Sequence, residues 1–166
     1  MITEPRLMMK PSFFVVGMRN GYHFGEIERD PAFINKLAAS FFDDHADRIQ
    51  DVRRPLTYVG VIEDPPPGSD FYHYTTGLEV RRMGTIPQGL IATTIPANKY
   101  AVFTYVGRHE PRAITLDTIR KIYDVIFGTW LPRTPHRLIR DYRLETINLA
   151  IATDDFCRME LCLPVA

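Results

Sequence analysis

The same succession of chain segments occurs twice in this sequence, about 86 residues apart, and this repetition is the strongest constraint on its fold. Each copy consists of a strand, a helix and two further strands. At this offset residues 14–16 align with 101–103, residues 58–60 with 143–145, and residues 78–80 with 163–165. The copies span about residues 12–83 and 89–166, so we expect one domain built from two similar halves.

Three segments of the first copy are rich in aromatic and β-branched residues, a composition that favours strands. They are residues 12–19, 57–62 and 71–80. A helix is expected between the first two, because Asp30 suits an N-cap and Pro31 suits the first helical position. Phe33, Leu37 and Phe41 then recur every four residues, which is the spacing of one helical face.

The second copy shows the same pattern. Strands are expected at residues 90–95, 100–106, 143–151 and 156–165. A helix is expected over residues 115–127, because Ile119, Ile122 and Ile126 fall on one face. Gly128 suits the C-terminal cap of this helix.

These segments predict an α+β fold in which two β-α-β-β repeats, related by a pseudo-twofold axis, form one antiparallel sheet with helices on one face. The opposite face is expected to form a central groove where the halves meet, and such a groove is a natural ligand site. Two polar stretches, residues 20–29 and 43–54, are expected to be a connection and a helix end.

The charge balance narrows the range of partners. The chain has 20 basic and 20 acidic residues, so its formal net charge is zero. Binding to a phosphate backbone needs a basic surplus, and we therefore expect no direct nucleic-acid binding. No apolar run approaches the ~18 residues of a membrane span, and the first residues lack the apolar core of a signal peptide. These features predict a cytoplasmic protein without a membrane partner.

Metal, cofactor and disulfide sites are not expected from the sequence. The histidines have no ligand spacing with a second His or Cys, and no glycine-rich phosphate loop is present. Cys157 and Cys162 lie on one expected strand, an odd number of residues apart. That separation places them on opposite faces, where they cannot easily bond to each other.

Glu145 is the residue that we expect to carry the chemistry. It lies in an apolar strand and shares a face with Ile147 and Leu149. Burying a carboxylate is costly unless it is paired or serves a ligand. Ligand contact is therefore one interpretation of Glu145, and an ion pair with Arg143 or Arg140 is the other.

A second set of polar candidates lies on the last strand and on its counterpart in the first copy. Glu160 and Arg158 alternate with apolar residues, so they are expected to face the groove or solvent. Thr75 and His73 occupy the matching positions of the first copy and would face the same groove. A simple ion pair between Glu160 and Arg158 is the alternative interpretation.

Four aromatic residues are candidate walls of a ligand site: Tyr74, Tyr105, Tyr123 and Trp130. Aromatic faces attract flat and cationic ligands. Ordinary core packing is the alternative for all four, and we favour it for Tyr105 and Tyr123.

Three groups of segments, in this order, resemble the GyrI-like small-molecule-binding domain, which is also the effector-binding domain of certain AraC-type and MerR-type regulators. The first group is residues 58–61 and 71–80, the second is 86–90 and 95–103 with Gly107, and the third is 122–123, 130–132, 144–145 and 163–165. The resemblance spans nearly the whole chain.

The resemblance implies a duplicated β-α-β-β fold whose central groove binds hydrophobic, often cationic compounds, with Glu145 at its base in contact with the ligand. The chain is similar to stand-alone members, which include gyrase-inhibitor-like proteins and hydrolases of cyclopropane-bearing natural products. The first helix departs from the family pattern, because it lacks the proline-aromatic signature and ends in the polar residues 43–47.

Three functions follow as hypotheses. The first is non-catalytic capture of a small organic ligand, with Glu145 providing charge or orientation. The second is a hydrolase that opens a strained or electrophilic ring, with Glu145 as general base and Glu160 or Tyr74 as acid. Two carboxylates in the groove would favour this enzyme, and one would favour binding. The third is regulation of a larger protein through residues 43–54.

Overall fold

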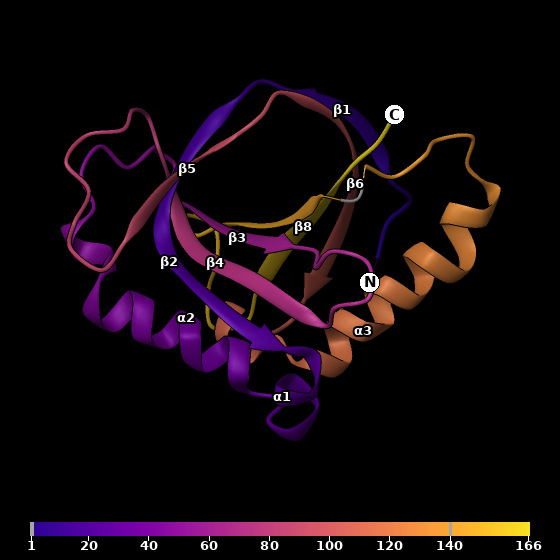
Figure 1. The fold of residues 1–166 in the computed structure, drawn as a ribbon, viewed down its shortest axis with the longest axis horizontal. Coiled ribbons are helices and arrows are strands. Elements are labelled where there is room, and N and C mark those ends of the chain that lie inside the picture. Colours follow the sequence, from indigo (N-terminus) through magenta and orange to yellow (C-terminus); the bar gives the residue numbers. More distant parts are fainter. Residues whose placement is uncertain (1, 140) are drawn as a thin grey trace.

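The computed structural model describes residues 2–139 and 141–166. Within these residues, eight strands form one antiparallel sheet, and the helices gather on one of its faces (Figure 1). The strands are β1 (Arg6–Lys10), β2 (Phe13–His23), β3 (Thr57–Glu63), β4 (Phe71–Val80), β5 (Ile91–Ile95), β6 (Asn98–Gly107), β7 (Tyr142–Asn148) and β8 (Cys157–Pro164). The α-helices are α1 (Phe24–Arg29), α2 (Phe33–Asp44) and α3 (Leu116–Val125), with a π-helical turn at Ile126–Trp130 and 3₁₀ turns at Ala46–Arg48, Pro111–Ala113 and Leu131–Arg133.

The sheet has the expected arrangement of two β-α-β-β repeats. Its strand order is β1-β6-β8-β7-β3-β4-β2-β5. The first repeat supplies β2, α2, β3 and β4, and the second supplies β6, α3, β7 and β8, so the halves meet where β3 pairs with β7. In this pair Gly60 lies directly opposite Glu145, with which it aligns in the repeat. A residue that pairs with its own counterpart lies on the pseudo-twofold axis.

The two edge strands exchange partners between the halves, which the sequence does not predict. β1 leads into β2 but pairs with β6, and β5 leads into β6 but pairs with β2. Two residues separate each edge strand from the next strand, so the chain ties one end of the sheet to the other. The sheet is therefore strongly curled, as Figure 1 shows.

The stretch 20–29, expected as a connection, instead continues β2 to His23 and then forms α1. Tyr22 pairs with Tyr72 across the β2–β4 ladder, and their rings stack with centroids 5.7 Å apart. This aromatic pair extends the strand beyond its apolar segment. In α1 the buried residue is Ile27, so one apolar side chain holds an otherwise polar helix against the protein.

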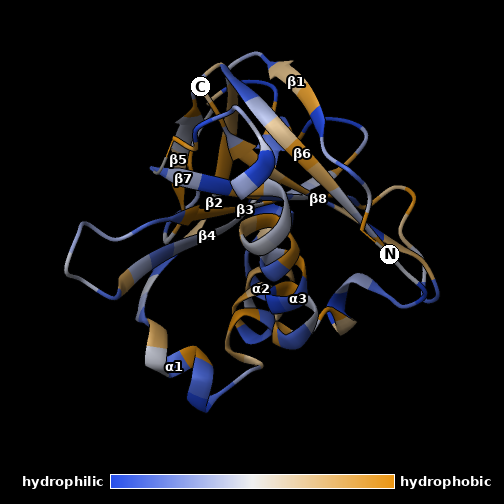
Figure 2. Cartoon of the chain, turned by 90° about the vertical axis from the view of Figure 1, so that its right-hand side faces the viewer, coloured by the Kyte–Doolittle hydropathy of each residue, from blue (hydrophilic) through white to orange (hydrophobic). Residues whose placement is uncertain are grey.

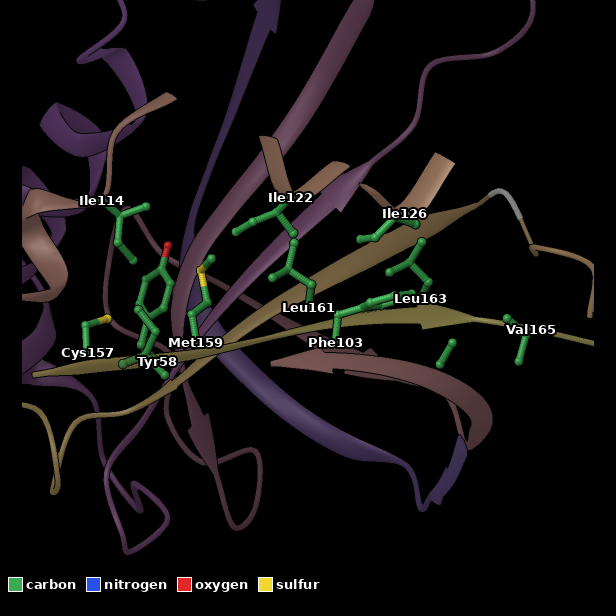
Figure 3. Close-up of a cluster of buried hydrophobic side chains, with 12 residues drawn as sticks. Tyr58, Phe103, Ile114, Ile122, Ile126, Cys157, Met159, Leu161, Leu163 and Val165 are labelled. Atoms are coloured by element: carbon green, nitrogen blue, oxygen red, sulfur yellow. The ribbon is translucent and has the colours of Figure 1, made fainter. Parts of the chain in front are cut away.

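The helix α3 packs its apolar face on the second half of the sheet. Thr115 caps the helix by accepting a hydrogen bond from the backbone N–H of Thr118 at 3.2 Å. Ile122 and Ile126 are buried in the cluster of Figure 3, which also contains Leu161. The helix does not end at Gly128 as expected, because the π-helical turn continues it to the 3₁₀ turn Leu131–Arg133.

The face away from the helices forms the inside of the curl of the sheet. A second core of buried apolar residues occupies part of this space, including Val15, Val59, Val102 and Leu144. Figure 2 shows the apolar strands of the curled sheet above the helices. The expected groove opposite the helices is present where β3 and β7 meet, but Glu145, which was expected at its base, lies instead in a second cavity on the helix side. None of the helices described is long and apolar enough to cross a membrane.

Candidate functional site

A cavity of about 390 Å³ lies between the sheet and the helices. Its floor comes from β2, β3, β4, β7 and β8, and its walls come from α1, α2, α3 and the loop before α3. This volume is within the ~300–1,000 Å³ that small-molecule pockets occupy. Because β3 and β7 both contribute, the two halves of the protein share one cavity.

Tyrosines make up much of the cavity lining. Tyr22, Tyr58, Tyr72 and Tyr74 come from the sheet, and Tyr123 comes from α3. Strand side chains alternate between faces, so Tyr72 and Tyr74 of β4 both face the helices. The apolar remainder of the lining includes Ile27 of α1, Ile34 of α2 and Ile119 of α3. The cavity thus offers aromatic and aliphatic surface on several sides.

Glu145 lies at the floor of this cavity and is 8% exposed. Its Oε2 accepts a hydrogen bond from the Tyr74 hydroxyl at 3.0 Å. The Tyr58 and Tyr74 hydroxyl oxygens are 2.7 Å apart. Because the Tyr74 proton points to Glu145, Tyr58 donates to Tyr74. Among the residues described, no side chain donates to the second oxygen of Glu145, which leaves it for a ligand.

The cavity shifts the pKa values of the ionisable side chains that line it. Burial raises the pKa of Glu145, whereas the hydrogen bond from Tyr74 and the positive charge of Arg143 oppose this rise. Burial and the nearby Glu145 carboxylate raise the pKa values of Tyr58, Tyr74 and Tyr123 well above their ordinary range. The tyrosines therefore remain hydrogen-bond donors, and Glu145 is a stronger base than an exposed carboxylate.

Gly60 makes room for the Tyr74 hydroxyl at the pseudo-twofold axis. A Cβ atom on Gly60 would overlap the Tyr74 hydroxyl oxygen, and it would lie 2.9 Å from the Tyr74 Cζ and 3.2 Å from the Tyr58 hydroxyl oxygen. Gly60 is the residue opposite Glu145 in the β3–β7 ladder. The missing side chain on one strand thus opens the space through which Tyr74 reaches the carboxylate on the other.

Arg143 is the positive group nearest to Glu145 along β7, but its ion pair is with another residue. Its guanidinium donates to Asp64 at 3.0 Å and lies 4.8 Å from the centre of the Tyr123 ring. The Tyr123 hydroxyl and the Arg143 Nε are buried without a hydrogen-bond partner within the described chain. The expected alternative, a simple ion pair of Glu145 with Arg143, is not formed; Arg140 lies outside the described residues.

Lining residues of α1 and of the segment after α3 are exposed, so we place the mouth of the cavity between α1 and α3. Phe24 of α1 is 42% exposed and Phe127 after α3 is 40% exposed, and both line the cavity. Arg120 of α3 is 3.8 Å from Glu28 of α1, so an exposed ion pair links the two sides. The mouth therefore presents apolar rings and one charge pair to an incoming molecule.

Of the aromatic candidates, Tyr74 and Tyr123 line the cavity. Tyr123 also packs against the buried cluster of Figure 3, so core packing, which we favoured from the sequence, and a place in the cavity lining both describe it. Tyr105 and Trp130 are not among the lining residues. Trp130 packs edge-on against Phe103 with ring centroids 5.2 Å apart. The Tyr105 hydroxyl is 2.7 Å from Nε2 of His109.

The remaining polar candidates lie on the other face of the sheet. Glu160, Arg158, Thr75 and His73 occupy strand positions that alternate with the cavity-lining residues, so their side chains point away from Glu145. Glu160 is 3.4 Å from Arg158, as the ion-pair interpretation expects, and 2.8 Å from Arg6. The structure therefore brings together Glu145 and Tyr74 but not Glu145 and Glu160.

Several lining residues were not candidates in the sequence analysis, namely Tyr22, Tyr58 and Tyr72, and Arg143 was considered only as an ion-pair partner of Glu145. A signal for them existed, because strand alternation from Glu145 and Tyr74 reaches Arg143 and Tyr72 directly. The pairing of Gly60 with Glu145 would then have placed Tyr58 on the same face. What the sequence did not reveal is which face the helices cover.

Two features of the described chain bear on metal and thiol chemistry. Over residues 2–139 and 141–166, no group of three or more His, Cys, Asp or Glu side chains could hold a metal ion. Cys157 packs in the core on the helix side and Cys162 in the core inside the curl, on opposite faces as expected. Burial raises their pKa values to about 11 and about 12, so both remain unreactive thiols.

Comparison with known proteins agrees with this architecture. The family model described as the GyrI-like small molecule binding domain matches residues 3–166. The transcriptional regulator BrlR of Pseudomonas aeruginosa is 33% identical over 102 residues, which are 61% of this chain and 35% of BrlR. The match thus spans about a third of the length of that regulator.

Two solved structures share the fold at low sequence identity. An integron cassette protein from the mobile metagenome of Vibrio cholerae has a TM-score of 0.72 and 13% identity, with 99% of this chain and 97% of that chain covered. The protein SAV2435, solved bound to tetraphenylphosphonium, also has a TM-score of 0.72 and 13% identity, with 99% and 94% covered.

Proposed function

Because this chain belongs to the GyrI-like small-molecule-binding family, we propose that it captures a hydrophobic organic cation in the cavity between the sheet and the helices. The ligand would enter between α1 and α3 and place its positive charge beside Glu145. Its apolar groups would lie against the tyrosines and the isoleucines of the walls. The chain would bind the compound and release it unchanged.

The observation that carries this proposal is a buried carboxylate with an oxygen left free in an aromatic cavity. A buried charge is costly, and an opposite charge from a ligand offsets that cost. The Tyr58–Tyr74 chain donates to one carboxylate oxygen only. Arg143 is held by Asp64, so its charge does not cancel that of Glu145 by direct pairing. The free oxygen is therefore matched to a cation or a hydrogen-bond donor.

The aromatic lining favours the same class of ligand. Tyrosine faces attract cations, and each contact contributes about 0.5–2 kcal/mol depending on its desolvation. Tetraphenylphosphonium, the ligand of the structural neighbour SAV2435, combines one positive charge with four phenyl rings. The chemistry of that ligand supports a cationic, aromatic compound for the present cavity as well.

The test compares two ions of the same shape and opposite charge. Tetraphenylphosphonium and tetraphenylborate would be titrated into the wild type and Glu145→Gln by calorimetry, with benzyltrimethylammonium as a smaller cation. We expect the wild type to bind the cations and reject the borate. The variant should bind cations at least about tenfold more weakly, a loss of about 1.4 kcal/mol.

Glu160→Gln is the matched control, because it removes the same charge from the opposite face of the sheet. It should leave the affinity for the cations within about twofold, as expected for a distant charge in salt. Equal binding of the phosphonium and the borate, or an unchanged affinity in Glu145→Gln, would contradict the proposal.

One observation favours a second candidate, a hydrolase that opens an electrophilic ring. Glu145 has a raised pKa, which suits a general base, and Tyr74 is placed to donate a proton beside it. Of the two carboxylates in the catalytic hypothesis, Glu145 faces the cavity and Glu160 points away from it. Simple binding is therefore the better-supported function. Incubation with an aryl cyclopropane and mass spectrometry would separate the two, since addition of water that requires Glu145 would establish the enzyme.

A further inference from the structure

We propose that the protein has a second ligand site, for a small organic anion, on the face of the sheet opposite Glu145. A cavity of about 480 Å³ lies at this face, beside the core inside the curl. Thr57 and Val59 of β3 and Thr146 and Asn148 of β7 line it. These residues alternate with Gly60 and Glu145, so the same two strands form a floor for both cavities, one on each side.

The charges around this second cavity favour an anion. Lys10, Arg53 and Arg158 line it, together with the carboxylates Glu79 and Glu160. Both carboxylates are already neutralised: Glu79 is 3.2 Å from Arg53, and Glu160 is held by two arginines at 2.8 and 3.4 Å. Positive charge is therefore in surplus, in a protein whose total charge is zero.

Lys10 is the cation that remains for a ligand. It is partly buried at the end of β1, and within the described part of the chain its ammonium has no ion-pair partner. Every other cation that lines the cavity has a carboxylate within 4.0 Å. An anion that entered the cavity would thus gain the charge of Lys10 without breaking an existing ion pair.

The floor adds hydrogen-bond donors that suit the same ligand. The Oδ1 of Asn148 accepts from the backbone N–H of Ala150 at 3.0 Å, which leaves the amide nitrogen of Asn148 to donate. The Thr146 hydroxyl lies on the same strand and the same face. Pro11, Phe13 and Ile151 supply apolar rims. A carboxylate or phosphate group on a small organic body matches these donors and surfaces.

Benzoate and glycerol 3-phosphate are suitable probes, because they present the two anionic groups on different bodies. Each would be titrated into the ¹⁵N-labelled full chain, with benzyl alcohol and glycerol as neutral controls. We expect at least one anion to shift the amide resonances of Thr146, Asn148 and Lys10, and the neutral compounds to leave them in place. A response to only one anion would tell carboxylate from phosphate recognition.

Two lysine variants make the test specific. Lys10→Ala should weaken anion binding by about fivefold or more, as expected for loss of a partly buried charge contact. Lys121→Ala removes an exposed lysine of α3 that pairs with Asp117, and it should leave the affinity unchanged. Glu145→Gln should also leave it unchanged, so failure of the cation site would not be mistaken for failure of this one. No saturable shift with either anion, or equal binding in Lys10→Ala, would overturn the proposal.

Discussion

The two halves of the sheet share a backbone plan but contribute different chemistry to the cavity. On the pseudo-twofold axis the first half has Gly60 and the second half has Glu145. By the same alignment, Met159 of the second half corresponds to Tyr74, and Arg143 corresponds to Tyr58. The first half thus provides hydroxyl donors and space, and the second provides the charges. The site is a single asymmetric assembly, although its scaffold is nearly symmetric.

The largest effect is expected from adding a side chain at Gly60, the residue on the axis that has none. In Gly60→Ala the added methyl group would displace the Tyr74 hydroxyl. Overpacking of this kind costs about 1–3 kcal/mol, so we expect the melting temperature to fall by about 3–10 °C in thermal unfolding. Cation affinity should fall with it, because Glu145 loses its donor.

Gly128→Ala is the control for Gly60→Ala, since a Cβ at Gly128 would meet nothing within 4 Å apart from its own stretch of backbone. The double variant Gly60→Ala, Tyr74→Phe should recover part of the lost stability, because the atom in conflict is gone. Equal melting temperatures for Gly60→Ala and Gly128→Ala would show that the axis tolerates a side chain.

Removing the charge of Glu145, the other residue on the axis, should make the unliganded protein more stable. Burial raises the pKa of Glu145, so the folded chain holds this proton more tightly than the unfolded chain. The tighter proton binding stabilises the folded chain fully below the ordinary carboxyl pKa. This stabilisation is lost as the pH rises through the pKa that Glu145 has in the folded chain. Glu145→Gln should therefore melt about 2–4 °C above the wild type at neutral pH, for a gain of about 1 kcal/mol.

The pH dependence separates this effect from general repacking. The difference in melting temperature between Glu145→Gln and the wild type should shrink toward zero near pH 4, where both side chains are neutral. Thermal unfolding from about pH 4 to pH 8 measures it. A difference that does not change with pH would show that burial of the charge is not its cause.

A smaller change tests the donor that the first half supplies. In Tyr74→Phe the carboxylate loses the hydrogen bond that lowers its pKa, so the pKa of Glu145 should rise further. The pH midpoint for binding of tetraphenylphosphonium should move upward, and affinity at neutral pH should fall by about threefold, the worth of one such hydrogen bond. Tyr105→Phe, outside the cavity, should leave the midpoint in place.

The smallest effect is expected where the halves touch across the mouth. Arg120→Gln removes an exposed contact to Glu28 that spans 3.8 Å. Exposed ion pairs contribute about 0–1 kcal/mol, so the affinity for tetraphenylphosphonium should change by about twofold at most. Stopped-flow binding would detect a change in rate if the pair also limits access. A loss of affinity as large as that of Glu145→Gln would show that the residues at the mouth matter as much for cation binding as Glu145 does.

The sequence predicted the repeated plan better than the edges of the sheet. Residues 71–80 form β4 as expected, because alternating aromatic and β-branched residues identify a strand locally. β1 was missed because its five residues alternate weakly, and its place depends on β6, about ninety residues away along the chain. α1 was missed because a single buried residue, Ile27, gives no helical period.

The candidate site was predicted in part for a similar reason. Strand alternation identified Glu145 as a carboxylate among apolar residues, and the structure places it in a cavity. Alternation divides side chains between two faces but does not say which face the helices cover. Glu145 was therefore assigned to the groove opposite the helices and grouped with Glu160, although their side chains point in opposite directions.

Gly60 and Glu145 lie on the pseudo-twofold axis, where exact symmetry would limit how much charge the centre of the fold can hold. A perfectly symmetric protein would place either two glycines or two glutamates side by side there. Two neighbouring carboxylates repel, and one of them would take up a proton. Joining both repeats in one chain removes that restriction, because each position can change alone. The chain thereby acquires an unshared negative charge at a point where two identical subunits could never have kept one.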